Sequence, residues 1–238
     1  MKGEAAYKRV LLKISGEALA GKSKIGLDHE FIGKVCNVIK EIVEMGVELG
    51  IVVGGGNFWR GRDGKDIDRT RSDHMGMLAT VLNSLALQGA LANIGVDTRV
   101  MTAIEMKEIA EPYIRNKAIS HLQKGRVVIF GCGLGVPFFS TDTAAALRAA
   151  EINADILLLA KNINYIYSDD PKKNPNAEKL LEISYSEILA RRLGVMDATA
   201  TSFSMDINMP ILLFGLDDPY NIIRAIKGEK IGTIVKEA

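Results

Sequence analysis

The sequence predicts an α/β fold built on a mainly parallel sheet. Apolar, β-rich runs alternate with stretches of helical periodicity along the whole chain, as they do in strand–helix–strand units. The runs are continuously apolar, which is typical of strands covered by helices on both faces. There is no Pro- or Ser-rich linker, no repeat and no block of like charge, so we expect residues 1–238 to form one domain.

Each expected element follows from a local pattern. Six apolar runs predict strands: Arg9–Ile14, Val47–Val53, Asp97–Met101, Val127–Phe130, Ile156–Leu159 and Ile211–Phe214. Helical spacing covers His29–Met45, Asp73–Asn93, Pro112–Gln123, Thr141–Glu151, Ser184–Arg191 and Asp197–Asp206. Residues typical of helix ends flank these stretches, namely the N-cap candidates Asp28, Asp73 and Ser184 and the terminal glycines Gly46, Gly95 and Gly125. The polar stretch Ser168–Lys179 is typical of an exposed excursion.

The composition excludes several classes of protein. Hydrophobic residues make up 47% of the chain, with 23 Gly and 6 Pro, so it is neither collagen-like nor disordered. The 30 Lys and Arg residues against 29 Asp and Glu give a net charge of +1, which removes the basic field that sequence-independent nucleic-acid binding needs. Cys36 and Cys132 fit neither a disulfide scaffold nor a four-ligand zinc site. Charges within the first apolar run leave no signal-peptide core. We expect a cytoplasmic protein that binds neither nucleic acid nor membrane.

The longest uncharged run, Met75–Val96, lies within one expected helix and is long enough to cross a membrane. Its polar residues point in several directions and leave no lipid-facing stripe; they are Thr80, Asn83, Ser84, Gln88 and Asn93. Such a helix is better buried against other protein, so we expect an oligomer contact here.

Loops of glycine or small residues follow three of the expected strands. The first strand ends in Lys13-Ile14-Ser15-Gly16, the second in Gly54-Gly55-Gly56-Asn57, and the fourth in Gly131-Cys132-Gly133-Leu134-Gly135. Ligands collect at the carboxyl ends of parallel strands, and glycines let consecutive amide N–H groups approach an anion. Any one of these loops also serves simply to end a strand, but the three together favour a phosphate site.

Charged residues accompany these loops. Lys13 stands in an apolar strand, where it either faces an anion or reaches solvent as an edge lysine. Arg60 and Arg62 follow the triple glycine and are either phosphate ligands or solvated loop residues. The acidic candidates are Asp73, Asp142, Asp170 and Asp197, of which Asp73 and Asp142 are alternatively helix caps. The histidines His29, His74 and His121 are scattered, so no Ser-His-Asp or Cys-His set is visible.

Residues Gly16–Ser23 match the Walker A pattern G-x-x-x-x-G-K-S/T. A Walker A loop opens a helix, but here Gly26 interrupts the segment within one turn and Asp28 resembles a new N-cap. None of the later strands ends in an immediate Asp for the magnesium role. We therefore predict that the segment is a loop and that the fold is not a Walker fold.

Several segments in a fixed order carry a resemblance to a known family. They are YKRVLLKISGEAL from Tyr7, VVGGGNFWRG from Val52, SDHMGMLATVLN from Ser72, GVPFFSTDTAAALRA from Gly135, VMDATA from Val195 and GEKIGTIV from Gly228. Over almost its whole length the chain resembles the bacterial uridylate (UMP) kinases of the amino-acid-kinase family. The resemblance implies a three-layer αβα sandwich and Mg²⁺-dependent transfer of the ATP γ-phosphoryl group to UMP, in pyrimidine nucleotide biosynthesis. It places acceptor binding and oligomer contacts mainly in the N-terminal part and ATP binding mainly in the C-terminal part.

The resemblance also implies roles for individual residues. Catalytic roles fall to Lys13, Asp142 and Asp197. The implied ATP site comprises Lys13, Ser15, Gly16, Gly56, Arg60, Asn162, Tyr167 and Asp170. The implied UMP site comprises Gly55, Asp73 at the ribose, and Leu134, Gly135, Val136, Pro137, Phe138, Phe139, Ser140 and Thr141. Mg²⁺ is expected to be held mainly by the ATP phosphates rather than by protein ligands.

Two features concern specificity and regulation. After the strand at Ile156–Leu159, Asn164 and Tyr165 stand where the family usually has Asp and Gly, so the adenine-side contact is Lys161 or Asn162, and we favour Asn162. Relatives bind GTP as an activator at the segment that here reads Gly21, Lys22, Ser23, Lys24, Ile25 and Gly26. They are usually hexamers inhibited by UTP. A short basic loop is most often simply solvated.

Two other functions stay open. A kinase of the same fold that phosphorylates carbamate or a small amino acid would share the Lys13 site. An amino-acid acceptor needs a cation for its α-carboxylate, and the segment from Phe138 to Thr141 with Asp73 instead favours a nucleotide. The other candidate is a nucleotide-sensing module without catalysis, which would not need Lys13, Arg60 and Asp142 at the γ-phosphoryl group.

Overall fold

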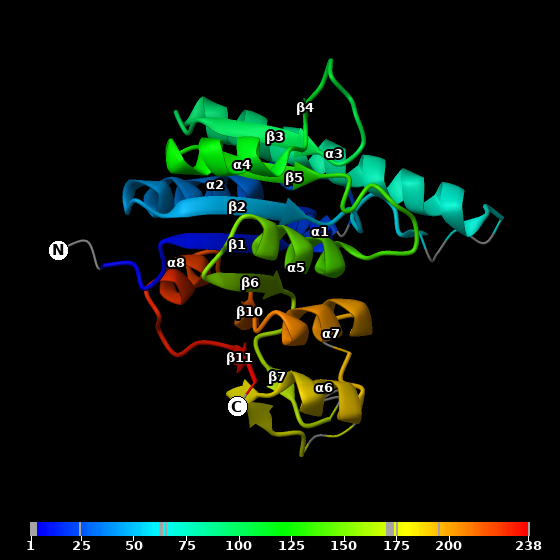
Figure 1. Ribbon diagram of the computed structural model, residues 1–238, viewed down its shortest axis with the longest axis vertical. Coiled ribbons are helices and arrows are strands. Elements are labelled where there is room, and N and C mark those ends of the chain that lie inside the picture. The colour runs from blue at the N-terminus through cyan, green and yellow to red at the C-terminus, as the bar shows by residue number, and fades with distance from the viewer. Residues whose placement is uncertain are drawn as a thin grey trace.

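The computed structural model describes residues 4–23, 25–61, 64, 66–169, 174, 176–194 and 196–237. Within them a nine-stranded sheet runs through the molecule in the order β4-β3-β5-β2-β1-β6-β10-β11-β9 (Figure 1). Its strands are β1 (Arg9–Ile14), β2 (Glu48–Val53), β3 (Thr98–Thr102), β4 (Glu111–Pro112), β5 (Val127–Gly131), β6 (Ile156–Lys161), β9 (Glu182–Ile183), β10 (Ile211–Gly215) and β11 (Thr233–Val235). All neighbouring pairs are parallel except β10 and β11.

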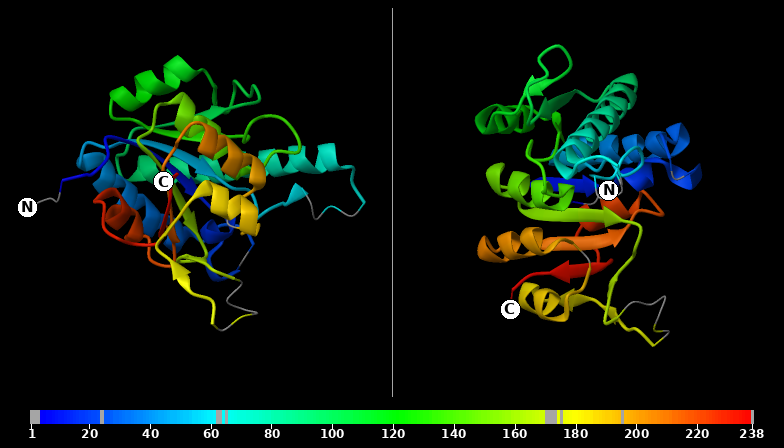
Figure 2. Two further views of the ribbon diagram at one scale, coloured as in Figure 1. Left: turned by 60° about the horizontal axis from the view of Figure 1, so that its bottom comes forward. Right: turned by 90° about the vertical axis from the view of Figure 1, so that its right-hand side faces the viewer.

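Helices cover both faces of the sheet. One face carries α2 (His29–Glu44), α3 (Arg69–Asn93) and α8 (Asn221–Ile226). The other carries α4 (Arg115–Gln123), α5 (Thr141–Glu151), α6 (Tyr185–Arg191) and α7 (Ala198–Asp206). The right-hand view of Figure 2 shows the sheet between these two layers. The predicted α/β fold and the implied three-layer αβα sandwich are confirmed.

The central strand β1 carries the first functional residue to its place. Its side chains alternate between the two cores: Val10, Leu12 and Ile14 pack under α2 and α8, and Leu11 packs under α5. Because side chains alternate along a strand, Lys13 shares the face of Leu11. The ammonium group therefore lies on the face that α5 covers, one residue before the strand ends.

Most of the predicted helix ends are confirmed. Asp28 caps α2 by accepting the Phe31 amide at 3.0 Å, and Ser184 caps α6 by accepting the Glu187 amide at 3.1 Å. The three glycines that follow helices have left-handed backbones, with φ of +84° at Gly46, +82° at Gly95 and +72° at Gly125.

Two predicted helix starts are wrong. The N-cap of α3 is Asp68, which accepts the Arg71 amide at 3.0 Å, so Asp73 lies inside the helix. The polar residues before Asp73 show no apolar spacing, and the pattern therefore places the start too late. The helix predicted over Pro112–Gln123 begins at Arg115, because Glu111–Pro112 forms the edge strand β4, where a proline is tolerated.

The Walker-like segment is not the loop that was predicted, because it forms two short helical pieces, but the prediction that it does not open a Walker-type helix is confirmed. It contains the short helix α1 (Gly16–Leu19) and the 3₁₀ turn η1 (Gly21–Ser23), with φ +53° at Gly21, and α2 begins only at His29. The predicted excursion Ser168–Lys179 links β7 (Ile166–Tyr167) to β8 (Lys179–Leu180), which pair in a separate two-stranded sheet. Residues 170–173 and 175 of this stretch lie outside the described residues.

By length and composition, α3 is the one helix in the described part of the chain that would span a membrane. Only part of it is buried within the chain: 44% of its most apolar stretch is buried, and Thr80, Asn83 and Ser84 are buried and hydrogen-bonded. The expected oligomer contact of this helix stays a prediction.

Candidate active site

The carboxyl ends of β1, β2, β5 and β6 open into one cleft of about 870 Å³. It joins the glycine loops to the start of α3, the first turn of α5 and the residues around the start of α7. Most of the predicted site residues line it, namely Lys13, Ser15, Gly16, Gly55, Gly56, Arg60, Asp73, Leu134, Val136, Phe138, Phe139, Ser140, Thr141, Asp142, Asn162 and Asp197. Residues distant in the sequence are therefore brought together at the carboxyl ends of the strands, as predicted for a parallel sheet.

A buried carboxylate between two lysines occupies this cleft. Asp142 Oδ1 lies 2.6 Å from Lys13 Nζ, and Asp142 Oδ2 lies 2.8 Å from Lys161 Nζ. Burial alone would raise the pKa of Asp142, but the two ammonium groups outweigh it and hold that pKa well below its usual range. Burial lowers the pKa of Lys161 despite the attraction of Asp142. We call these three residues the Lys13–Asp142–Lys161 cluster; the negative charge of Asp197, which lines the same cleft, also acts on Lys161.

Asp197 ties two helix starts together beside the cluster. It caps α7 by accepting the Ala200 amide at 2.9 Å, and it also accepts the hydroxyls of Ser140 and Thr143. Ser140 in turn caps α5 by accepting the Asp142 amide at 3.0 Å. Asp142 is therefore not the helix cap, and its carboxylate is left for the lysines.

The loops after β1 and β2 touch each other through glycine. A Cβ on Gly16 would lie 2.6 Å from the Gly54 carbonyl oxygen and 2.8 Å from the Gly56 nitrogen, closer than such atoms approach. The Gly54 amide donates to the Ile14 carbonyl at 2.9 Å. Only glycine permits this contact, and it sets the triple-glycine loop, Gly54–Gly56, beside Ser15 and Lys13 at the mouth of the cleft.

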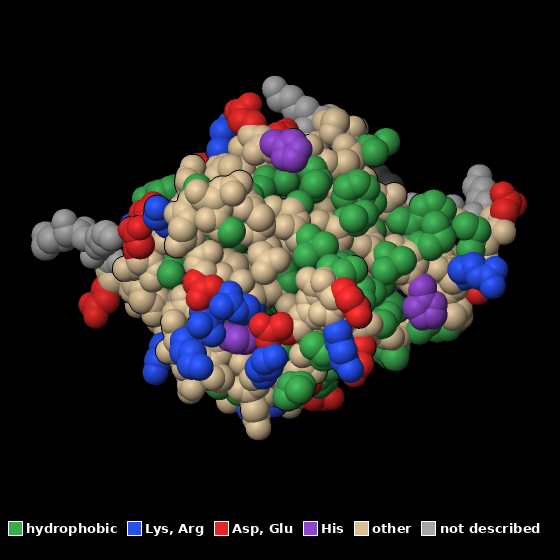
Figure 3. Space-filling view, turned by 90° about the horizontal axis from the view of Figure 1, so that it is seen from above, with side chains coloured by type: hydrophobic (Ala, Val, Ile, Leu, Met, Phe, Trp, Pro, Cys, Tyr) green, Lys and Arg blue, Asp and Glu red, His purple; other side chains and the backbone are tan. Residues whose placement is uncertain are grey.

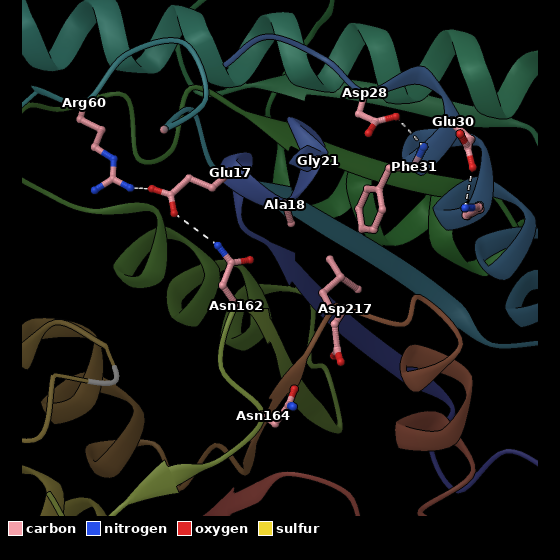
Figure 4. Close-up of a pocket in the computed structure, with 13 residues that line it drawn as sticks. Glu17, Ala18, Gly21, Asp28, Glu30, Phe31, Arg60, Asn162, Asn164 and Asp217 are labelled. Atoms are coloured by element: carbon pink, nitrogen blue, oxygen red, sulfur yellow. Dashed lines mark hydrogen bonds and ion pairs between the residues drawn. The ribbon is translucent and has the colours of Figure 1, made fainter. Parts of the chain in front are cut away.

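Arg60 lies at the boundary between this cleft and a neighbouring cavity of about 1120 Å³. Figure 4 shows its guanidinium paired with Glu17 of α1, whose other oxygen lies 3.4 Å from Asn162 Nδ2. Glu17 thus holds together residues from the loops after β1, β2 and β6.

On the α3 side of the cleft, Asp73 holds the loop that precedes α5. Its Oδ2 accepts the Phe138 amide at 2.8 Å, and Arg69 Nε donates to its two oxygens at 2.9 and 2.8 Å. Phe138 has a φ of +72°, is 67% exposed and lies under Arg69, whose Cζ is 5.8 Å from the ring centroid. Exposed aromatic surface from Phe138 and Phe139 therefore borders the cleft.

Three other predicted residues that the structure describes, Gly135, Pro137 and Tyr167, are not among those that line the cleft. Gly135, with φ +76°, shapes the loop by donating its amide to the Cys132 carbonyl at 2.8 Å, and Pro137 lies within the same loop. Tyr167 is half-buried in β7, opposite Lys179. Asp170 and Arg62 lie outside the described residues. The ATP contacts of Tyr167 and Asp170 stay predictions.

The segment Gly21–Gly26 connects α1 to α2. Ser23 donates its hydroxyl to the Ala20 carbonyl at 2.7 Å, Ile25 is 77% exposed, and Gly26 has a φ of +76°. The side chain of Lys22 and the whole of Lys24 lie outside what the structure describes, so the predicted polyphosphate contacts of these lysines stay predictions.

Both cysteines are buried, although Cys132 borders the cleft. Cys36 is buried, and burial raises the pKa of its thiol to about 11. Cys132 is also buried, and burial raises its pKa as well. This agrees with the interpretation of both cysteines as core residues.

Sequence reasoning missed four residues around the cleft. The position of Glu17, an acidic residue directly after a predicted phosphate-binding loop, could have identified it. The spacing of Arg69 could also have identified it, because it stands four residues before Asp73 on the same helix face. Asn57 and Asn83 hydrogen-bond to each other across 26 residues, and no local pattern identifies such a pair.

Known proteins match this chain over nearly its whole length. The model of the amino acid kinase family matches residues 8–214. The crystal structure of a UMP kinase from Bacillus anthracis has a TM-score of 0.93 and 39% sequence identity, covering 97% of this chain and 96% of that one. A UMP kinase from Ureaplasma parvum has a TM-score of 0.91 and 37% identity, with coverages of 97% and 99%. A uridylate kinase from Archaeoglobus fulgidus is more distant, with a TM-score of 0.73 and 28% identity over 95% of this chain and 99% of that chain.

Proposed function

Because the chain belongs to the amino acid kinase family, we propose that it is a UMP kinase, which transfers the γ-phosphoryl group of ATP reversibly to UMP and forms UDP and ADP. The observation that carries this proposal is the Lys13–Asp142–Lys161 cluster. It lines the same cleft as the glycine loops after β1 and β2 and the segment from Leu134 to Thr141. The likeness to bacterial UMP kinases over nearly the whole chain supports UMP as the acceptor.

The cluster suits phosphoryl transfer better than acid–base chemistry. The transferred group passes through a loose transition state whose charge spreads over three oxygens, and the protein acts by positioning and neutralisation. Lys13 and Lys161 supply the positive charge, and Asp142, which stays ionised because its pKa is low, holds both ammonium groups in place. The phosphate oxygen of UMP is already a nucleophile, so no general base is needed.

The two nucleotides enter from different sides of the cluster. The backbone amides of Gly16 and Gly56, the side chain of Ser15 and the guanidinium of Arg60 face the ATP phosphates, while the Ser15 amide donates to the Ala160 carbonyl of β6. Lys161 is engaged by Asp142, which favours Asn162 as the adenine-side contact. The adenosine contacts that the family resemblance implies for Tyr167 and Asp170 are kept as part of this proposal.

UMP binds between α3 and the segment from Leu134 to Thr141, with Gly55 at its phosphate end. Asp73 accepts bonds from Arg69 and Phe138, but a carboxylate has about four acceptor positions, so it has room for a ribose hydroxyl. The exposed rings of Phe138 and Phe139 offer apolar surface to the base.

Magnesium fits this site as a partner of the phosphates. Among the described residues, no group of three or more His, Cys, Asp or Glu side chains is placed to hold a metal ion, and both oxygens of Asp142 already face lysines. A Mg²⁺ ion carried by ATP keeps most of its ligands from phosphate and water, and it neutralises phosphate charge when bound.

The acceptor separates this proposal from its alternatives. A coupled assay of ADP release with Mg-ATP is run against UMP, CMP and a set of small amino acids. We expect turnover with UMP, with CMP weaker because the two bases differ by a single amino-for-carbonyl exchange that one or two hydrogen bonds detect. Turnover with an amino acid alone indicates a different kinase of this family, and ATP binding without any turnover indicates a sensor.

Regulation and assembly follow the same family model. We propose a cytoplasmic homohexamer that is activated by GTP near Gly21–Gly26 and inhibited by UTP. If titration with GTP changes neither the rate nor the sensitivity to UTP, the regulatory part of the proposal fails while the catalytic part stands.

A further inference from the structure

We infer that Asn57 and Asn83 form a positioning pair that fixes the triple-glycine loop against α3; this inference rests on the proposed function. Asn83 Nδ2 donates to Asn57 Oδ1 at 2.7 Å, and Asn57 Nδ2 donates to Asn83 Oδ1 at 3.0 Å. Each amide also donates to a backbone carbonyl: Asn83 to Gly54 at 2.6 Å, and Asn57 to Gly26 at 2.7 Å.

The pair is fully buried and internally complete. Asn83 is 0% exposed and Asn57 is 2% exposed. The two backbone carbonyls require an NH₂ group in front of them, which fixes the orientation of both amides. Each NH₂ group therefore uses both hydrogens and each side-chain oxygen accepts one. A buried amide without its partner is strongly disfavoured, so removing one member releases the other.

The pair controls the position of the loop on which both nucleotides depend. Gly54 is held on one side by the hydrogen bond from Asn83 and on the other by the close contact with Gly16. The position of the loop between β1 and α3 is therefore fixed from both sides. The start of α3 carries Asp73, on the acceptor side, while Gly56 and Arg60 lie on the donor side. Asn83 thus sets the distance between the two halves of the reaction without touching either nucleotide.

The same pair reaches the segment between α1 and α2. The Gly26 amide donates to the Asn57 carbonyl at 3.1 Å, and the Asn57 side chain donates back to the Gly26 carbonyl, so the two residues are joined in both directions. A displacement of Gly26 therefore acts on Asn57 and, through Asn83, on Gly54. This provides a physical connection from the Gly21–Gly26 segment to the cleft.

The test compares Asn83→Ala, Asn57→Ala and the double variant with a matched control, Ser84→Ala. Ser84 is the next residue of α3 and is equally buried, and its hydroxyl donates to the Thr80 carbonyl of its own helix at 2.8 Å. Values of kcat and KM for ATP and UMP are measured at 25 °C, with folding checked by circular dichroism and thermal unfolding.

We expect each single variant to lose about tenfold or more in kcat, because small misplacements of reacting groups have large effects on rate. The double variant should lose no more than the worse single one, since the two side chains act as a unit. Ser84→Ala should stay within about twofold of wild type. Asn57 lies outside the helices, so Asn57→Ala decides the question if Asn83→Ala does not fold.

The inference is overturned if both single variants keep kcat within about twofold of wild type, or if their losses multiply in the double variant, either of which would indicate independent packing roles. A wild-type chain without UMP-dependent turnover instead overturns the proposed function, and with it the pair's role.

Discussion

At the scale of the residue, Lys13 has the most demanding environment in the cleft. Its side chain is 9% exposed and its ammonium lies 2.6 Å from Asp142, so its charge is little screened by water. We expect Lys13→Met to lower kcat by about 10² to 10³ while the fold persists, the range seen when one preorganised charge-stabilising group is lost.

The matched control for Lys13 is Lys107→Ala. Lys107 is also paired with a carboxylate, 3.1 Å from Glu105, but its side chain is 68% exposed. It should keep wild-type kcat. Equal kcat values for Lys13→Met and wild type would contradict the role of the ammonium.

The lowered pKa of Asp142 leads to a separate prediction about stability in acid. Its pKa in the folded protein is held below the unfolded value, which is about 3.9 for an Asp side chain. Its contribution to stability is therefore complete above that value and is lost as the pH falls toward the folded pKa. We expect the free energy of urea unfolding to fall more steeply between about pH 5 and pH 3 in wild type than in Asp142→Asn.

Asp97→Asn provides the comparison for this pH experiment. The neighbouring arginines also lower the pKa of Asp97, against the effect of its burial, but its side chain is 53% exposed and its pairs are screened by solvent. Its removal should change the slope less than removal of Asp142. Identical slopes for wild type and Asp142→Asn would show that the carboxylate is not held in its charged form by the lysines.

At the scale of the element, α3 combines a buried and an exposed apolar face. Leu78 and Leu82, one turn apart, are 51% and 53% exposed. Figure 3, which looks onto the top of the view in Figure 1, shows hydrophobic side chains gathered on the side toward which α3 extends. Such a surface marks a protein contact, and we expect α3 to pack against a second copy of the chain.

This contact is tested by light scattering. Wild type should have a mass that is a multiple of 25.9 kDa, and Leu82→Arg should shift it toward the monomer. Leu181→Arg is the control, because Leu181 is 67% exposed at the opposite edge of the sheet, beside β9, and should leave the mass unchanged. A monomeric wild type would contradict the expectation.

At the scale of the whole molecule, patterns that extend over many residues were sufficient to predict the architecture. The six long strands and the glycine loops each carry a continuous local signal, and parallel topology then brings their ends together. Elements of two or three residues, such as β4, β9 and β11, are too short to show a period. They form because the tertiary structure presents an edge to pair with.

The candidate site was predictable to the same extent. Lys13 and the glycine loops could be predicted as site residues because they stand at strand ends. The partner of Lys13 could not, because Asp142 comes from a separate element, as does Lys161, which contacts the other oxygen of Asp142. From its position alone Asp142 could equally have been a helix cap, but Ser140 fills that role. The Asn57–Asn83 pair was beyond prediction for the same reason: its members share space but no sequence pattern.

The most direct test of the proposed chemistry follows the phosphoryl group itself. The protein is incubated with UMP, Mg²⁺ and ATP labelled in its γ-phosphate, and the products are separated by chromatography. The label should appear in UDP, at a rate that depends on UMP and that Lys13→Met largely abolishes. Label that stays in ATP, or that appears only as free phosphate at a rate independent of UMP, would contradict a UMP kinase.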